Sequence, residues 1–203
     1  MKLSNWLPLL TGFAQAASLP PRQGNPIQII SVTTSGSGCP AGTVATEISP
    51  DGSTLVLGFD AYQTSVFAGS PSADREKFCD VSVKARYPLG CTKAVFDTTS
   101  HGFALLESGV SGTVLSSYSF SPGSIVSGAS SPATVLQGSQ FEEGDVYTKQ
   151  DEVATKATVR NANERDITYV VRSRVFLQAS NQQAFGTLTV DDLSISVTAQ
   201  TAC

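Results

Sequence analysis

Charged and chemically versatile residues are scarce in this chain of 203 residues. Charged residues make up 15% of it, and it contains one His, one Trp and one Met. The 13 Lys and Arg residues are scattered and are outnumbered by 17 Asp and Glu, which gives a net charge of −4. Because no basic stripe is available to follow a phosphate backbone, nucleic acid is not expected as a partner. The hydrophobic content of 40% is typical of a globular protein.

The short motifs of common metal, catalytic and modification sites are also missing. No Cys-x-x-Cys pair occurs and there is a single imidazole, so neither a metal nor a cofactor is expected. The Gly-x-Ser-x-Gly elbow of many hydrolases and the Asp-x-Asp-x-Asp-Gly loop of many calcium sites are absent. No Asn-x-Ser/Thr sequon occurs, which excludes N-glycosylation.

The first 16 residues predict a secretory signal peptide. Lys2 precedes a modest apolar segment, residues 6–14, which ends in the small-x-small site Ala14-Gln15-Ala16. A buried helix is the alternative, but Pro8 and Gly12 interrupt it. No later stretch is apolar enough to span a membrane. We therefore expect a secreted, extracellular protein.

Beyond the signal peptide the sequence predicts a leader and one domain. Residues 17–26 form an extended, proline-containing leader, and residues 27–203 contain no linker or charge run that would divide them. Cleavage after Ala16 removes Trp6, the only tryptophan. Since tryptophan is a favoured platform for sugars, a flat crystalline polysaccharide is a less favoured ligand than a soluble glycan or a protein.

An even number of cysteines in an exported chain implies a disulfide framework. The four are Cys39, Cys79, Cys91 and Cys203, so three pairings of two disulfides are possible. We favour Cys39 with Cys79 and Cys91 with Cys203, because the second bond would tie down the C-terminus.

Alternation of apolar and polar residues predicts an all-β fold, an antiparallel β-sandwich stabilised by two disulfides. Val81 and Val83 alternate with Asp80, Ser82 and Lys84, so one face of that strand is expected to be wet. The expected strands are 27–34, 43–48, 54–59, 78–87, 93–97, 102–107, 112–120, 167–178, 188–190 and 193–197. Other expected features are a turn at 49–52, a short helix at 72–77, a surface loop at 121–138 and a β-bulge at 191–192.

Several segments, read in order, resemble one protein family. They are SGSGCPAGTV (35–44), SPDG (49–52), LGFDAY (57–62), KFCDVSV (77–83), YPLG (87–90), HGFALLESGV (101–110) and YSF (118–120). Over residues 27–200 the chain is similar to the domain-of-unknown-function 4360 family, small secreted proteins abundant in fungi. That family usually carries Phe at the position of Cys91 and a Pro-Cys in its C-terminal third, so no disulfide pairing is carried over from it. The resemblance implies a secreted β-sandwich and assigns no activity.

Candidate catalytic groups are few and poorly arranged. A Ser-His-Asp site would need His101 between a carboxylate such as Asp97 and a serine such as Ser111, but His101 precedes Gly102 at an expected turn. A glycosidase needs two carboxylates across a cleft, and the same acids could bind calcium. These acids are Glu142, Glu143, Asp145, Asp191 and Asp192, for which solvated surface positions are the simpler interpretation. No residue is assigned a catalytic or metal-binding role.

A binding role is the favoured interpretation. Sandwiches present faces and loops to polymers, and the aromatics to test are Tyr62, Tyr118, Phe141 and Tyr147, with core positions as the alternative. Arg165, Arg172 and Arg174 carry most of the local positive charge and are interpreted as a solvated strand face. We predict a monomeric, non-catalytic module that binds a glycan or an extracellular protein at the cell wall, cell surface or host interface. A secreted hydrolase acting on glycans or esters and a structural wall protein are the alternatives.

Overall fold

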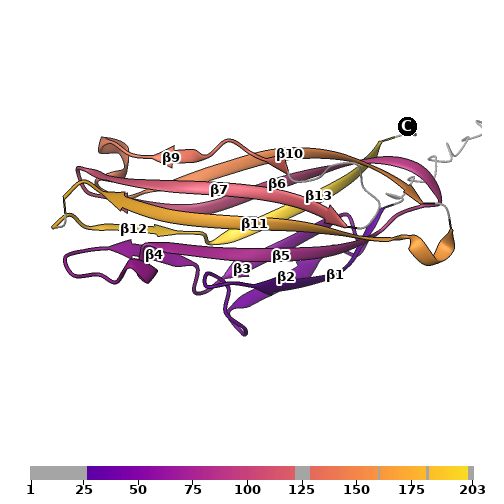
Figure 1. Ribbon diagram of the computed structural model, residues 1–203, viewed down its shortest axis with the longest axis horizontal. Helices are drawn as coiled ribbons and strands as arrows, with labels where there is room; N and C mark the ends of the chain where they lie inside the picture. Colours follow the sequence, from indigo (N-terminus) through magenta and orange to yellow (C-terminus); the bar gives the residue numbers. More distant parts are fainter. Residues whose placement is uncertain (1–26, 122–128, 160, 182, 201–203) are drawn as a thin grey trace, which may run out of the picture.

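The computed structural model describes residues 27–121, 129–159, 161–181 and 183–200, which form two antiparallel sheets (Figure 1). The predicted signal peptide, the leader and Cys203 lie outside these residues. Within the described part of the chain, the first sheet, sheet A, has six strands. In spatial order they are β1 (Gln28–Ser35), β5 (Glu76–Arg86), β11 (Asp166–Ala179), β7 (Val110–Ser121) and β8 (Ala129–Ser130), with β9 (Thr134–Leu136) also paired to β7.

Sheet B has seven strands among the described residues. In spatial order they are β2 (Val44–Ile48), β3 (Thr54–Phe59), β13 (Asp192–Gln200), β6 (Gly90–Leu106), β12 (Gly186–Thr189) and β4 (Gln63–Val66), with β10 (Asp145–Val159) also paired to β6. Three short 3-10 helices connect strands: η1 (Ser72–Asp74), η2 (Ser139–Phe141) and η3 (Ala162–Glu164). In the described part of the chain, no helix is long and apolar enough to cross a membrane.

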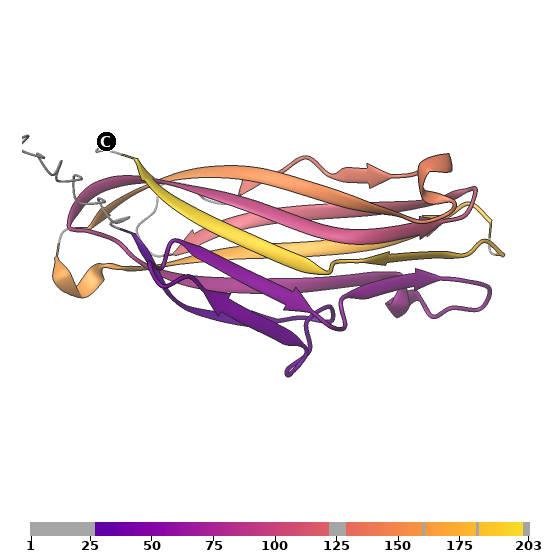
Figure 2. The same cartoon turned by 180° about the vertical axis from the view of Figure 1, so that it is seen from behind.

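The two sheets pack face to face, as both views of the ribbon show (Figures 1 and 2). Phe96 of β6 in sheet B stacks on Tyr169 of β11 in sheet A, with ring centroids 4.2 Å apart. The hydroxyl of Thr98 lies 3.3 Å from that of Tyr169, which joins the sheets through a buried polar contact. The expectation of antiparallel, all-β sheets is therefore confirmed.

Period-two alternation explains most of the strands. Along β5, Val81 and Val83 are fully buried, whereas Lys84 and Arg86 point outward and are exposed. Burial of each such valine is worth about 1.5–3 kcal/mol relative to exposure. The expected hairpin also forms: Asp51 accepts hydrogen bonds from both Ser49 and Ser53 in the turn that joins β2 to β3.

The prediction of two separate strands at 93–97 and 102–107 is wrong. One strand, β6, runs from Gly90 to Leu106, and His101 lies within it instead of at a turn. Gly102 is needed there for close packing: a Cβ atom at this position would lie 2.1 Å from the carbonyl oxygen of Thr189 and 2.8 Å from the Tyr147 ring. A glycine that suggested a turn is thus a contact point between strands.

Further differences concern the last third of the chain and the connections. Two strands were not predicted from the sequence: β10, in which Lys149 and Asp151 occupy inward positions, and the short strand β4. The expected helix at 72–77 is only the 3-10 helix η1, and the expected loop at 121–138 contains β8 and β9, with residues 122–128 outside the described residues. At the predicted bulge, 191–192, the register against β6 shifts by one residue, because Leu188 pairs with Ala104 but Asp192 pairs with His101. The extra residue predicted there is thus present, and across it the chain passes from β12, which pairs with β4, to β13, which pairs with β3.

Candidate functional site

The outer face of sheet A is the surface formed by the outward side chains of β1, β5, β11 and β7. Strand pairing aligns these side chains in rows across the sheet. One row contains Ser35, Asp80, Arg172 and Ser117, and the next contains Thr33, Ser82, Val170 and Ser119. Short hydroxyl side chains thus flank a central pair of opposite charges.

Ion pairs cross from β5 to β11 over this face. Arg172 donates two hydrogen bonds to Asp80, at 2.6 Å from Nε and 2.7 Å from Nη2, a planar bidentate geometry. Nearer one end of the strands, Arg174 donates from Nε to Glu76 at 2.7 Å. These hydrogen bonds raise the pKa of both guanidinium groups, and the one from Arg174 lowers the pKa of the Glu76 carboxyl.

A second charged group lies at the other end of the same strands. Asp166 accepts two hydrogen bonds from Arg86 and lies 3.1 Å from the Lys84 ammonium. The Arg86 and Lys84 hydrogen bonds lower the pKa of Asp166 from 3.8 to about 2. The four cations on the rows of this face, Lys84, Arg86, Arg172 and Arg174, therefore each have a carboxylate partner.

The serine hydroxyls between these groups are not used by the fold. Within the described part of the chain, the hydroxyls of Ser35, Ser82, Ser117 and Ser119 have no hydrogen-bond partner. Ser35 and Ser119 are exposed and the other two are half-buried. Each hydroxyl can both donate and accept, so the face offers unused hydrogen-bonding capacity to a ligand.

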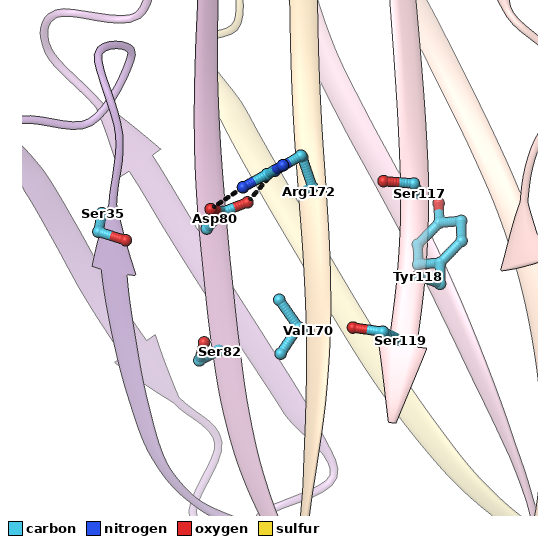
Figure 3. Close-up of a pocket in the computed structure, with 8 residues that line it drawn as sticks. All are labelled: Ser35, Asp80, Ser82, Ser117, Tyr118, Ser119, Val170 and Arg172. Carbon is cyan, nitrogen blue, oxygen red and sulfur yellow. Dashed lines mark hydrogen bonds and ion pairs between the residues drawn. The ribbon is translucent and has the colours of Figure 1, made fainter. Parts of the chain in front are cut away.

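Two adjoining hollows lie on the outer face of sheet A. The larger, about 490 Å³, is lined by the four serines together with Asp80, Val170, Arg172 and part of Tyr118 (Figure 3). The smaller, about 380 Å³, is lined by Glu76, Phe78, Arg172 and Arg174. Arg172 lines both hollows, so one ligand could touch both.

Aromatic rings on this face are covered by guanidinium groups. Arg172 lies over the ring of Phe78 at 5.3 Å from its centroid, and Arg174 lies over Phe176 at 5.4 Å. Such stacking holds each guanidinium flat and restricts its rotamers. The smaller hollow is therefore amphipathic, with ring carbons below and planar charged groups above.

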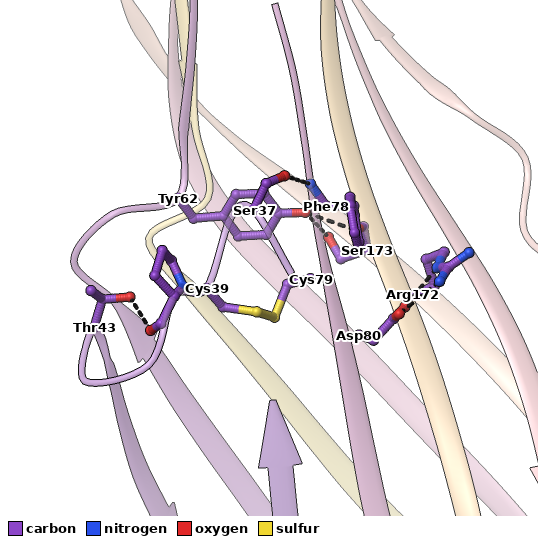
Figure 4. Close-up of a disulfide and its surroundings, with 10 residues drawn as sticks. Ser37, Cys39, Thr43, Tyr62, Phe78, Cys79, Asp80, Arg172 and Ser173 are labelled. Carbon is purple, nitrogen blue, oxygen red and sulfur yellow. Dashed lines mark hydrogen bonds and ion pairs between the residues drawn. A yellow bond between two sulfur atoms is a disulfide. The ribbon is translucent and has the colours of Figure 1, made fainter. Parts of the chain in front are cut away.

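The aromatics proposed from the sequence as binding residues are all buried. Tyr62 and Tyr118 are each 2% exposed, and Phe141 and Tyr147 are each 6% exposed. The Tyr62 hydroxyl donates to the carbonyl of Ser173 at 2.8 Å, and its ring lies so close to Gly38 that a Cβ there would be 2.3 Å away (Figure 4). The alternative, that these residues belong to the core, is what the structure shows, and none offers an exposed ring face to a ligand.

The hydrogen bonds of the other tyrosines explain their burial. Tyr118 donates to Asp151, which also pairs with Lys149 at 2.6 Å. Tyr147 donates to the carbonyl of Thr189 at 2.6 Å. Burial raises the pKa of both phenols well above its ordinary value, so both stay protonated donors.

The predicted disulfide between Cys39 and Cys79 is confirmed, with Cα atoms 5.5 Å apart (Figure 4). It fastens the loop after β1 to the inward side of β5, where both cysteines are buried in the core. A cross-link between residues 40 positions apart stabilises a domain by about 4 kcal/mol in the chain-entropy model. It is the only disulfide among the described residues, and the proposed partner of Cys91, Cys203, lies outside them.

His101 does have a carboxylate partner, though not the one considered from the sequence. Its Nδ1 lies 2.8 Å from Asp192, on the outer surface of sheet B. The side chains of His101 and Asp192 are 48% and 40% exposed, so water reaches both partners. Among the described side-chain hydrogen bonds of His101, none joins it to a serine, so the Ser-His-Asp arrangement considered from the sequence is not assembled in this structure.

The acidic residues considered for glycosidase or calcium chemistry are dispersed. Glu142 and Glu143 are exposed directly after η2, and Asp145 accepts a hydrogen bond from Gln140 at 2.8 Å. Asp191 accepts one from Thr189, and Asp192 belongs to the pair with His101. Among the described residues, no three His, Cys, Asp or Glu side chains are placed to hold a metal ion.

The charged residues of the outer face of sheet A were predictable from the sequence, but their arrangement was not. Arg172 and Arg174 were interpreted as a solvated strand face, and Asp80 and Ser82 as the wet side of a strand. Ser117 and Ser119 were not singled out. The period-two pattern of 112–120 places both on one face of a strand, but it does not indicate that this face lies beside Arg172.

The chain is similar in sequence to a known secreted protein and weakly similar in structure to two solved proteins. An uncharacterized secreted protein of Arthroderma benhamiae is 32% identical over 192 residues, which is 91% of this chain and 76% of that protein. TmCBM61 in complex with β-1,4-galactotriose has a TM-score of 0.31 at 13% identity, covering 85% of this chain and 91% of that one. A CBM4 structure has a TM-score of 0.19 at 8% identity, covering 83% and 86%. At these scores neither structure bears on what this chain binds. Residues 25–203 match the domain of unknown function DUF4360, and the chain belongs to that family.

Proposed function

We propose that this protein is a secreted, non-catalytic binding module whose binding site is the outer face of sheet A. One observation carries the proposal: four hydroxyls without internal partners surround the Asp80–Arg172 pair in a hollow of about 490 Å³. These hydroxyls make no hydrogen bond within the described part of the chain, so a ligand with donors and acceptors could bind to them.

Secretion rests on independent features. The buried Cys39–Cys79 disulfide is of a kind that persists in oxidising compartments. The relative from Arthroderma benhamiae is a secreted protein, and the first 16 residues have the pattern of a signal peptide. We place the module outside the cell, at a wall, a cell surface or a host interface.

The hydrolase alternative has less support. Its best candidates, His101 and Asp192, lie on the other sheet and are largely exposed to solvent. A structural wall protein would use the same polar face but would be released from the wall only by harsh extraction. Binding of the purified protein therefore separates the proposal from both alternatives.

The test is binding of the oxidised mature protein to a glycan array and to cell-wall fractions, with the variant Arg172→Ala. Removal of Arg172 opens both hollows and leaves Asp80 unpaired without touching the core. We expect saturable binding by the wild type and at least a tenfold loss of affinity in Arg172→Ala, about 1.4 kcal/mol.

Gln150→Ala is the matched control, because Gln150 lines a polar hollow of about 410 Å³ on sheet B. It should bind like the wild type. Loss of binding in Gln150→Ala with retention in Arg172→Ala would place the site on sheet B and contradict the proposal. No binding of the wild type to any probe would also contradict it, and turnover of an array glycan would favour the hydrolase.

A further inference from the structure

The charge balance of the outer face of sheet A indicates what kind of ligand it suits. Each cation on its rows is paired: Arg172 with Asp80, Arg174 with Glu76, and both Lys84 and Arg86 with Asp166. An anionic polymer would have to compete with ion pairs as short as 2.6 Å. An uncharged ligand can be accommodated without breaking them.

The groups on this face that make no hydrogen bond within the protein are of the kind that bind sugar hydroxyls. Serine hydroxyls, like sugar hydroxyls, both donate and accept, so a glycan can satisfy Ser82, Ser117 and Ser119 in either direction. Arg172 keeps Nη1 free after its two bonds to Asp80, and Arg174 uses only Nε for Glu76. The N–H groups of Arg172 and Arg174 that are not bonded to carboxylates can therefore donate hydrogen bonds to the oxygen atoms of an uncharged glycan.

The smaller hollow supplies the apolar contact that sugar rings also need. Phe78, the aromatic residue that lines this hollow, is half-buried, and the flat guanidinium group of Arg172 lies over its ring. A pyranose ring has polar edges and an apolar C–H face, which suits a site with hydroxyls beside stacked planar groups.

The two hollows together are long. Along β5 they extend from Glu76 to Ser82, which is about 20 Å at roughly 3.3 Å per residue. A single sugar would fill only part of this length, and Arg172 lies where the hollows meet. The length of the two hollows therefore suits a chain of several sugar units.

We infer that the ligand is an uncharged, hydroxyl-rich glycan chain of several sugar units, lying along β5 and β11 and bridging both hollows at Arg172. The inference rests on the proposed function and specifies its ligand. It predicts that affinity rises with chain length and depends little on salt, because no net charge is neutralised on binding.

The experiment is calorimetric titration with cello-, laminari-, chito- and galacto-oligosaccharides from monosaccharide to hexasaccharide, at low and high salt. Polygalacturonate and heparin form the anionic arm. We expect at least tenfold tighter binding of one neutral series between monosaccharide and tetrasaccharide, and less than a twofold effect of salt. The double variant Ser117→Ala/Ser119→Ala, which keeps all the ion pairs, should weaken binding about tenfold, and Gln150→Ala should leave it unchanged.

Each contrary result has a distinct meaning. Salt-sensitive binding to the anionic polymers alone, lost in Arg172→Ala, would leave the proposed function standing and overturn the inference of a neutral ligand. Neutral binding that does not increase beyond the monosaccharide would overturn the extended chain. Binding of wall fractions without any oligosaccharide binding would also overturn the inference. Absence of all binding would overturn the proposed function itself.

Discussion

The pair Asp80–Arg172 on the outer face of sheet A and the pair Lys149–Asp151 inside the sandwich have similar geometry in opposite surroundings. Both bring nitrogen within 2.6 Å of oxygen. The side chains of Arg172 and Asp80 are 57% and 22% exposed, whereas those of Lys149 and Asp151 are 3% and 6% exposed. Water screens the outer pair, so it contributes little to stability and stays available to a ligand. The inner pair has lost its water, so its energy depends on every hydrogen bond being made.

The inner pair has the partners that its burial requires. The Lys149 ammonium donates to Ser131 at 2.7 Å, and the Tyr118 hydroxyl donates to Asp151. Both charges point inward from β10, which pairs with β6 and lies at an edge of sheet B. Inward charges on an edge strand disfavour its pairing with another chain. The two ion pairs thus differ in surroundings: the outer one is in contact with water on the proposed binding face, and the inner one is enclosed with its own hydrogen-bond partners.

The largest expected effect is on the inner pair. Lys149→Met leaves the Asp151 carboxylate buried without its counter-charge, which should destabilise the protein by about 3–5 kcal/mol. Urea unfolding followed by far-ultraviolet circular dichroism measures this change. A loss below about 1 kcal/mol would mean that water reaches Asp151 and that the contrast with the outer pair is false.

The double variant Lys149→Met/Asp151→Leu is the control for that result. With both charges removed, most of the lost stability should return, because no buried charge remains. The edge strand then lacks its inward charges, so sedimentation velocity should detect self-association that the wild type does not show.

Tyr118→Phe should have the next largest effect, with Tyr147→Phe for comparison. The Tyr118 hydroxyl donates to a carboxylate, and its loss should destabilise by about 1.5–3 kcal/mol. Tyr147 donates to the neutral carbonyl of Thr189, so its loss should amount to about 1 kcal/mol. Equal losses in the two variants would show that the charge of Asp151 adds nothing to the bond.

The same contrast explains which strands were predictable from the sequence. In 167–178 and 78–87 the inward residues are apolar except for Ser173, so alternation identified β11 and β5. In β10 the inward series includes Lys149 and Asp151, which interrupt the apolar pattern. The strand was missed because its charges are satisfied by Tyr118 and Ser131, and no local pattern predicts those distant contacts.

The candidate site was predictable only in part, for a related reason. Alternation placed Asp80 and Ser82 on a wet face, but their positions opposite Arg172 and Val170 depend on strand register between distant segments. Aromatic type likewise does not distinguish core from surface: Tyr62 and Tyr118 are buried, while Phe78 stays half-exposed beneath Arg172. Which side chains lie next to one another across a sheet depends on the pairing of distant strands, so it cannot be deduced from the local sequence.

Arg172→Ala should change stability much less than it changes binding. The pair with Asp80 is exposed, so its loss should lower the free energy of unfolding by less than about 1 kcal/mol. Thermal unfolding of the variant beside wild type checks this. A loss as large as that of Lys149→Met would mean that the outer pair holds the sheet together, and the binding defect could then not be assigned to the site.

The smallest expected effect is the pH dependence contributed by Asp166. Hydrogen bonds from Arg86 and then Lys84 lower its pKa from 3.8 to about 2 in the folded protein. Because the folded-state pKa lies below that of the unfolded chain, the stabilisation is fully present above about pH 4 and is lost as the pH falls toward about 2. The unfolding temperatures of wild type and Asp166→Asn should therefore differ by a constant amount at neutral and mildly acidic pH. This difference should vanish only as the pH approaches about 2. If the difference in unfolding temperature vanished already near pH 5, Arg86 and Lys84 would not be stabilising the ionised carboxylate of Asp166. These two cations would then lack a charged partner in mildly acidic surroundings.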